Sequence, residues 1–85
     1  MDKIIKKKWM NFVFSHKSDS EKTEIWDVLK KDVDTHLGVI YWEGSFRQYV
    51  FRPADMTYFS ASCLKEIEEV IMELYNKWKM NHSKN

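Results

Sequence analysis

Few residues in this 85-residue sequence have side chains suited to chemistry, and the first is its only cysteine, Cys63. It falls where a helix is predicted to begin, and free backbone amides there favour a thiolate. A nucleophilic thiol also needs a base close by. His16 and His36 are expected in distant loops and His82 in the C-terminal tail. The sequence therefore predicts a packed, unreactive cysteine and a protein that is not an enzyme.

A second candidate is the alternation of Asp32, Asp34 and His36 through a predicted turn. Their oxygen and nitrogen atoms could hold a divalent cation. The spacing matches no recognised metal loop, and acidic residues are common in turns because they bond nearby backbone groups. Gly38 and Gly44 are the only glycines, so no glycine-rich phosphate loop exists. We expect a solvated turn, with no metal, no cofactor and no small-molecule ligand.

Basic residues near aromatic residues form the third candidate, because such a surface can pair phosphates and stack bases. The candidate nucleic-acid contacts are Lys6, Lys7, Lys8, Arg47 and Arg52. The alternative is that Arg47 lies across Trp42 as an internal cation–π contact and that the lysines solubilise the N-terminal end. The formal net charge of +1 argues against a protein that coats DNA.

The elements that position these residues are predicted from turn signals and from hydrophobic periodicity. Strands are expected at residues 10–14, 23–29, 37–42 and 46–52, with residues 3–9 as a helical turn or basic lead-in and 56–59 as a fifth strand. Gly44-Ser45 predicts a two-residue type II′ hairpin turn, because glycine accepts positive φ. Trp42 would then face Arg47, and Ile40 would face Tyr49. Pro53 ends the last strand.

A C-terminal amphipathic helix is the strongest pattern in the chain. Ser60 or Ser62 is the natural N-cap. Apolar residues then recur at spacings of three and four, namely Leu64, Ile67, Val70, Ile71, Leu74, Tyr75 and Trp78. The predicted fold is α+β, an antiparallel sheet of four or five strands in meander order with this helix packed on one face. We expect a single domain, 1–85, with a basic lead-in at 1–9 and a polar tail at 81–85.

The predicted hairpin carries bulky side chains on both faces, yet one helix covers only one of them. We expect Ile40, Trp42, Tyr49 and Phe51 to lie against the helix. The other face needs the N-terminal segment, a second copy or a foreign protein as its cover, because large exposed apolar patches mark interfaces. The candidate interface comprises this second face and the acidic helix face: Leu37, Val39, Tyr41, Gln48, Val50, Glu66, Glu69 and Glu73.

Three segments of the chain carry a resemblance to a known group of proteins. They are Gly38-x-Ile40-x-Trp42, then Phe46-Arg47-x-Tyr49-x-Phe51-x-Pro53, and Cys63-Leu64-x-Glu66-Ile67. Residues 37–72 thereby resemble small uncharacterised proteins of phages and prophages. Phe46 stands where that group has Trp, and Tyr41 where a basic residue is usual. The resemblance implies an accessory protein of a mobile element in a bacterial cell and implies no activity.

The leading hypothesis is a non-enzymatic protein-interaction module whose partner is another protein or a second copy of itself. Nucleic-acid binding is the alternative. No apolar run approaches the length of a membrane span, and the charged first residues do not form a signal peptide. A single cysteine suits a reducing compartment. We therefore expect a cytoplasmic protein of the bacterial host cell, without membrane contact.

Overall fold

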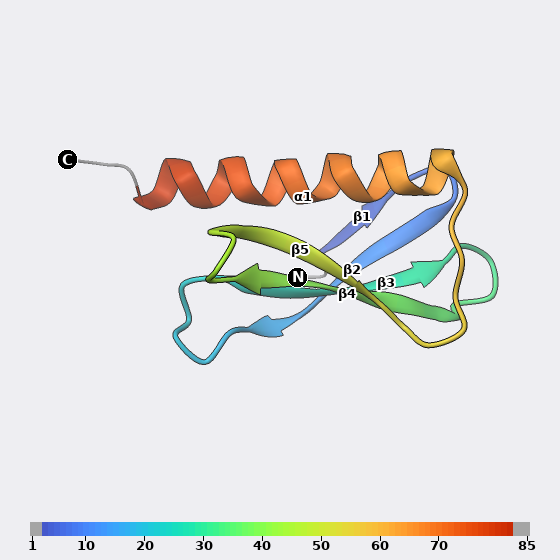
Figure 1. The fold of residues 1–85 in the computed structure, drawn as a ribbon, viewed down its shortest axis with the longest axis horizontal. Coiled ribbons are helices and arrows are strands. Elements are labelled where there is room, and N and C mark those ends of the chain that lie inside the picture. The colour runs from blue at the N-terminus through green and yellow to red at the C-terminus, as the bar shows by residue number, and fades with distance from the viewer. Residues whose placement is uncertain (1–2, 83–85) are drawn as a thin grey trace.

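The computed structural model describes residues 3–82 and shows one antiparallel sheet beneath one long helix (Figure 1). The strands follow each other in the order β1-β2-β3-β4-β5. Their bounds are β1 (Ile4–Lys6), β2 (Met10–Lys17), β3 (Glu24–Lys30), β4 (His36–Glu43) and β5 (Gln48–Pro53), and the helix is α1 (Ala61–His82). The predicted α+β meander with a C-terminal helix on the sheet is confirmed.

The fifth strand lies at the N-terminal end of the sheet. Residues 4–6 form β1, which pairs with β2 so that Ile4 faces Val13 and Lys6 faces Asn11. The expectation of a helical turn in the basic lead-in is wrong there, because the β-branched pair Ile4-Ile5 favours an extended chain and β2 provides a pairing partner. Residues 57–60 have no regular structure. The strand predicted at residues 56–59 is therefore also wrong. At the other end, α1 continues through residues 81 and 82 of the predicted tail, whose residues 83–85 lie outside the described part.

The hairpin between β4 and β5 has a longer turn than predicted. Glu43 pairs with Gln48, so four residues make the turn, and the amides of Phe46 and Arg47 donate to the Glu43 carbonyl at 3.1 and 2.9 Å. Arg47 takes the left-handed conformation with φ of 56°. The predicted two-residue turn at Gly44-Ser45, and with it the strand position of Arg47, is therefore wrong.

The corrected register still leaves the predicted faces unchanged. Trp42 pairs with Tyr49, and Ile40 pairs with Phe51. The partners move by two residues relative to the prediction, and two residues is the side-chain period of a strand. Ile40 and Tyr49 are buried, while Trp42 and Phe51 are partly buried against the same core. Their predicted packing on the helix side is confirmed.

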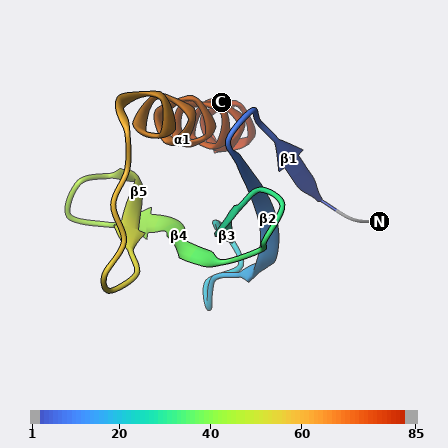
Figure 2. The ribbon, with the colours of Figure 1, turned by 90° about the vertical axis from the view of Figure 1, so that its right-hand side faces the viewer.

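The core lies between the sheet and one face of α1. Figure 2 views the helix nearly end-on and shows the sheet curving beneath it from β1 to β5. The buried side chains are Met10, Phe12, Trp26, Val28, Ile40, Tyr49, Ile67, Val70 and Leu74. Ser60 is the N-cap, because its hydroxyl accepts the Cys63 amide at 3.2 Å. Leu64 differs from the prediction: it is 52% exposed, and Cys63 packs against the core instead.

A bulge between β3 and β4 changes the position of Leu37. Val28 pairs with Gly38, whereas Leu29 pairs with His36, so Leu37 is the extra residue. Leu37 consequently packs against the core and does not share the second face with Val39. Gly38 has φ of 156°, and a Cβ at this position would lie 2.5 Å from the backbone oxygen of Arg52. The bulge therefore requires glycine at position 38.

Candidate functional site

The second sheet face is apolar, but its side chains are only partly exposed. Val39, Tyr41 and Val50 are half-buried although no helix covers them, and Gln48 is exposed at the start of β5. β1 extends the edge of the sheet and does not fold over this face. The face therefore has less exposed apolar surface than the sequence suggests.

The acidic helix face is not a free surface. Glu66 is only 8% exposed, and its two carboxylate oxygens accept the Trp9 amide at 3.2 and 3.0 Å. Glu69 pairs with Lys7 at 3.2 Å, and Glu73 is exposed. The prediction of Glu66 as an exposed contact is wrong, because this carboxylate joins α1 to the β1–β2 turn. We name the contact between Glu66 and Trp9 the helix latch.

The structure does not bring the five candidate nucleic-acid contacts together. Lys6, Lys7 and Lys8 lie on β1 and the β1–β2 turn, while Arg52 lies on β5 at the opposite edge of the sheet and Arg47 in the turn before it. Lys7 is paired with a carboxylate, and the Lys8 ammonium lies 5.2 Å from the centre of the adjacent tryptophan ring. These contacts form no continuous surface.

Trp42 packs inside an aromatic cluster. Its ring centre lies 4.5 Å from that of Trp78, 5.5 Å from that of Tyr49 and 6.4 Å from that of Tyr75. The predicted internal contact assigned Arg47 to this ring, but Arg47 lies in the exposed turn. Aromatic pairs at these distances contribute roughly 0.5–1.5 kcal/mol beyond their buried area, so the cluster holds the end of α1 on the β4–β5 hairpin.

A groove of about 390 Å³ opens where the chain passes from β5 to α1. Two side chains on its rim are almost fully exposed, Met56 at 97% and Tyr58 at 92%, and Trp9 is also exposed. The complete lining is Trp9, Met10, Lys30, Thr35, Leu37, Met56, Thr57, Tyr58, Ser60 and Cys63. We name this feature the corner groove.

The loop that forms one wall of the corner groove is held at both ends. The Ala54 amide donates to the Leu37 carbonyl at 2.9 Å, and the Thr57 hydroxyl donates to the Ala54 carbonyl at 2.7 Å. Phe59 packs edge-on against Phe51, with ring centres 5.2 Å apart. These anchors fix the loop that carries the exposed side chains Met56 and Tyr58, while the helix latch fixes Trp9, which also lines the groove.

Sequence reasoning missed the corner groove, because it predicts a strand at residues 56–59. Residues 56–59 alternate between exposed and half-buried side chains, as a strand would. No strand pairs with this segment, so its outward residues Met56 and Tyr58 remain exposed.

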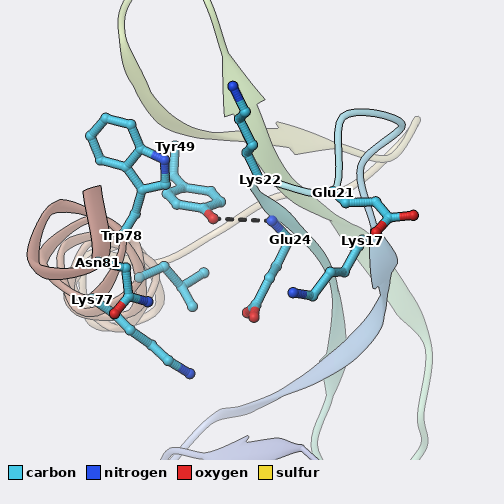
Figure 3. Close-up of a pocket in the computed structure, with 9 residues that line it drawn as sticks. Lys17, Glu21, Lys22, Glu24, Tyr49, Lys77, Trp78 and Asn81 are labelled. Carbon is cyan, nitrogen blue, oxygen red and sulfur yellow. Dashed lines mark hydrogen bonds between the residues drawn. The ribbon is translucent and has the colours of Figure 1, made fainter.

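A second pocket, of about 260 Å³, lies near the C-terminal end of α1 and is lined by Lys17, Glu21, Lys22, Glu24, Tyr49, Leu74, Lys77, Trp78 and Asn81 (Figure 3). The Glu24 amide donates to the Tyr49 hydroxyl at 3.1 Å. Burial raises the pKa of Tyr49, and the negative charge of Glu24 raises it further. The hydrogen bond from the Glu24 amide lowers this pKa, but the net shift is upward. We name this feature the lysine pocket.

Glu24, which lines the lysine pocket, is held in its charged form. Its carboxylate accepts the Trp26 indole N–H at 3.0 Å and the Lys3 ammonium at 3.1 Å. Burial alone would raise the pKa of this carboxyl, but the two hydrogen bonds and the charges of Lys3 and Lys77 together lower it below its ordinary value.

The remaining candidates form no site within residues 3–82. In this range no three His, Cys, Asp or Glu side chains gather in a way that could hold a metal ion. His36 faces Asp27 at 3.1 Å, and Asp32 and Asp34 adopt positive φ in the β3–β4 turn. No helix of this range combines the length and the apolar character needed to cross a membrane.

Comparisons with known proteins find no matching family model, no matching curated protein and no matching solved structure.

Proposed function

We propose that this protein is a non-enzymatic protein-binding module that takes a bulky side chain of a partner protein into the corner groove. One observation carries the proposal: Met56 and Tyr58 stand almost fully exposed beside Trp9 around a preformed hollow. Trp, Tyr and Met are enriched in protein interfaces. Exposed apolar patches around a groove mark such interfaces.

Charges around the corner groove indicate what lies next to the bulky side chain of the partner. Lys30 lines the groove and Lys8 lies beside Trp9. The first turn of α1 contains no acidic residue, so the partial positive charge of the helix N-terminus is uncompensated there. Asp55, next to Met56, is the acidic residue of the loop itself. The partner segment that fits this surface has an apolar or aromatic residue flanked by acidic ones.

The biological setting of the proposal rests on the resemblance to phage and prophage proteins. It places the protein in the bacterial cytoplasm as an accessory factor of a mobile element, with a host or phage protein as its partner. The second sheet face around Val39 and Val50 is a candidate for self-association, and a homodimer formed through it leaves the corner groove open.

A peptide selection tests the occupant of the corner groove. The wild-type protein, a Met56→Ser/Tyr58→Ser variant and a Phe46→Ser control are each immobilised and exposed to a displayed library of random peptides. Phe46 is an exposed aromatic residue in the β4–β5 turn, away from the groove lining. We expect wild type and control to enrich peptides with a bulky residue beside Asp or Glu, and the groove variant to bind them about 30-fold more weakly, as for an interface hot spot.

Two results contradict the proposal. One is an equal selection by all three proteins, or no enrichment by any of them, at matched urea midpoints that show the variants are folded. The other is a wild-type dimer in light scattering that the Met56→Ser/Tyr58→Ser variant abolishes, because the groove then holds a second copy of the chain.

A further inference from the structure

The sheet face that points away from α1 carries an acidic and a basic residue within an apolar surface. No helix or strand of residues 3–82 lies across this face, since α1 covers the other one and β1 only extends the sheet (Figure 1 and Figure 2). One row of paired residues crosses all five strands on it: Ile4, Val13, Asp27, Val39 and Arg52. The acid of this row is on β3 and the base is on β5, with Val39 of β4 between them.

The position of Val39 between opposite charges makes this face complementary to itself. A two-fold axis that runs along β4, between two copies, turns β3 of one copy over β5 of the other. Val39 then meets Val39 of the second copy, and each Asp27 lies opposite an Arg52, as in an isologous interface. From this geometry we propose that the second sheet face binds a second copy of this chain about an axis along β4, an inference that rests on the self-association included in the proposed function.

The neighbouring row of the sheet fits the same axis. Tyr41 of β4 pairs with Val50 of β5, so the axis brings Tyr41 onto Tyr41 of the second copy. Val50 then faces Ile25 of β3, which lies on this face because side chains alternate along a strand and Trp26 is buried on the other face. An axis across the strands would instead place each charged residue of the first row against its own copy, and like charges oppose association.

Both charged groups of the row are accessible in a single copy. The Asp27 side chain is 39% exposed, and one of its oxygens lies 3.1 Å from Nε2 of His36. Arg52 is exposed and, among residues 3–82, takes part in no ion pair within 4.0 Å. Its guanidinium has the planar fork of donors that suits a carboxylate. Since Val13 and Val39 flank Asp27 in the row, the new ion pair would form in an apolar setting, where screening by salt is weaker.

The curvature of the sheet limits the strength of this contact. Figure 2 shows the sheet curving around the core, so the second face is the outer one and two copies meet only through β3, β4 and β5. Three strands about 4.8 Å apart, with about six residues each, give roughly 300 Å² per copy, less than the roughly 800 Å² of a standard interface. We therefore expect a weak dimer, with a dissociation constant of roughly 100 µM.

Sedimentation equilibrium of the full chain at low salt, up to about 1 mM protein, tests the inference. Asp27→Arg and Arg52→Asp each place like charges opposite one another and should weaken association by about 30-fold or more. An equimolar mixture of the two variants should associate again, because every charge in the mixed dimer then faces its opposite. Arg47→Asp is the matched control, since it reverses the same charge in the exposed turn before β5, and should associate as the wild type does.

Three results overturn the inference. The first is a wild-type protein that stays monomeric at about 1 mM, ten times the expected dissociation constant. The second is an equal loss of association in Arg47→Asp, which assigns the effect to net charge. The third is a mixture of folded variants that stays monomeric.

Two features keep the test decisive. Asp27→Asn preserves the size of the side chain and should weaken association by about tenfold, so the result does not depend on whether Asp27→Arg folds; unchanged association in Asp27→Asn counts against the ion pair. Neither Asp27 nor Arg52 lines the corner groove, so peptide selection by that groove is independent of these variants and each proposal fails on its own experiment.

Discussion

The helix latch predicts a large and specific loss of stability on truncation of Glu66. In Glu66→Ala, the Trp9 amide loses the carboxylate that accepts it at 3.0 and 3.2 Å. A hydrogen bond to a charged group contributes about 1.5–3 kcal/mol, and leaving its buried partner unsatisfied costs a similar amount. The site is partly buried, so we expect the free energy of unfolding to fall by about 2 kcal/mol.

Urea unfolding measures this change. With a slope near the lower end of the range for small domains, about 1 kcal/mol per molar, the midpoint should fall by about 2 M. Glu66→Gln keeps an acceptor and should lose less than half as much. Glu68→Ala is the matched control, because Glu68 is an exposed glutamate on the same helix. The reasoning is refuted if Glu66→Ala and Glu68→Ala have the same midpoint, or if exchange of the Trp9 amide with solvent is equally slow in both.

Three further predictions concern the bulge, one ionised group and the helix face. Gly38→Ala should destabilise the protein by about 2 kcal/mol or more in urea, because its Cβ meets the Phe51 ring at 2.6 Å as well as backbone; an unchanged midpoint contradicts this. Burial raises the pKa of Glu24, but hydrogen bonds and nearby lysines lower it overall, so its contribution is present above the unfolded pKa and is lost as the pH falls through the folded pKa. Between about pH 7 and about pH 3 the wild type should therefore lose more stability than Glu24→Gln, and equal losses in urea titrations count against the assignment. Leu64→Ala should cost less than about 1 kcal/mol and Val70→Ala about 2 kcal/mol, in line with their burial; calorimetric midpoints in the reverse order would contradict the assigned helix face.

The fold could be predicted where one pattern extended over many residues. The apolar spacing from Ile67 to Trp78 repeats through several helical turns, so single exceptions such as Leu64 do not obscure it. The alternation in β3 likewise predicts that Trp26 and Val28 share one face of the sheet, and both are buried. The faces of the β4–β5 hairpin survived an error in its turn, because that error was an even number of residues.

The parts that could not be predicted depend on contacts between distant segments. β1 is three residues long, and its β-branched residues form a strand by pairing with β2. Glu66 has the sequence context of an exposed helix residue, and only the approach of Trp9 makes it a buried acceptor. The left-handed residue of the hairpin turn is Arg47 and not the glycine that turn chemistry favours. The pairing of β1 and the burial of Glu66 therefore depend on tertiary contacts.

The corner groove and the lysine pocket were missed for the same reason. Met56 and Tyr58 become exposed because their loop is anchored to Leu37 and Phe51 elsewhere in the chain. The residues that line the lysine pocket come together because the end of α1 lies close to the start of β3. Neither arrangement leaves a periodic trace in the sequence.

The two edge strands of the sheet, β1 and β5, have features that oppose aggregation. β1 is too short to template a long neighbour, and it ends in the exposed ammonium of Lys6. β5 terminates at Pro53, which has no amide hydrogen to offer an incoming chain, with the exposed cation of Arg52 before it. Such features oppose the edge-to-edge pairing of two sheets through backbone hydrogen bonds. These two edges are therefore poor templates for the growth of a fibril from copies of this protein.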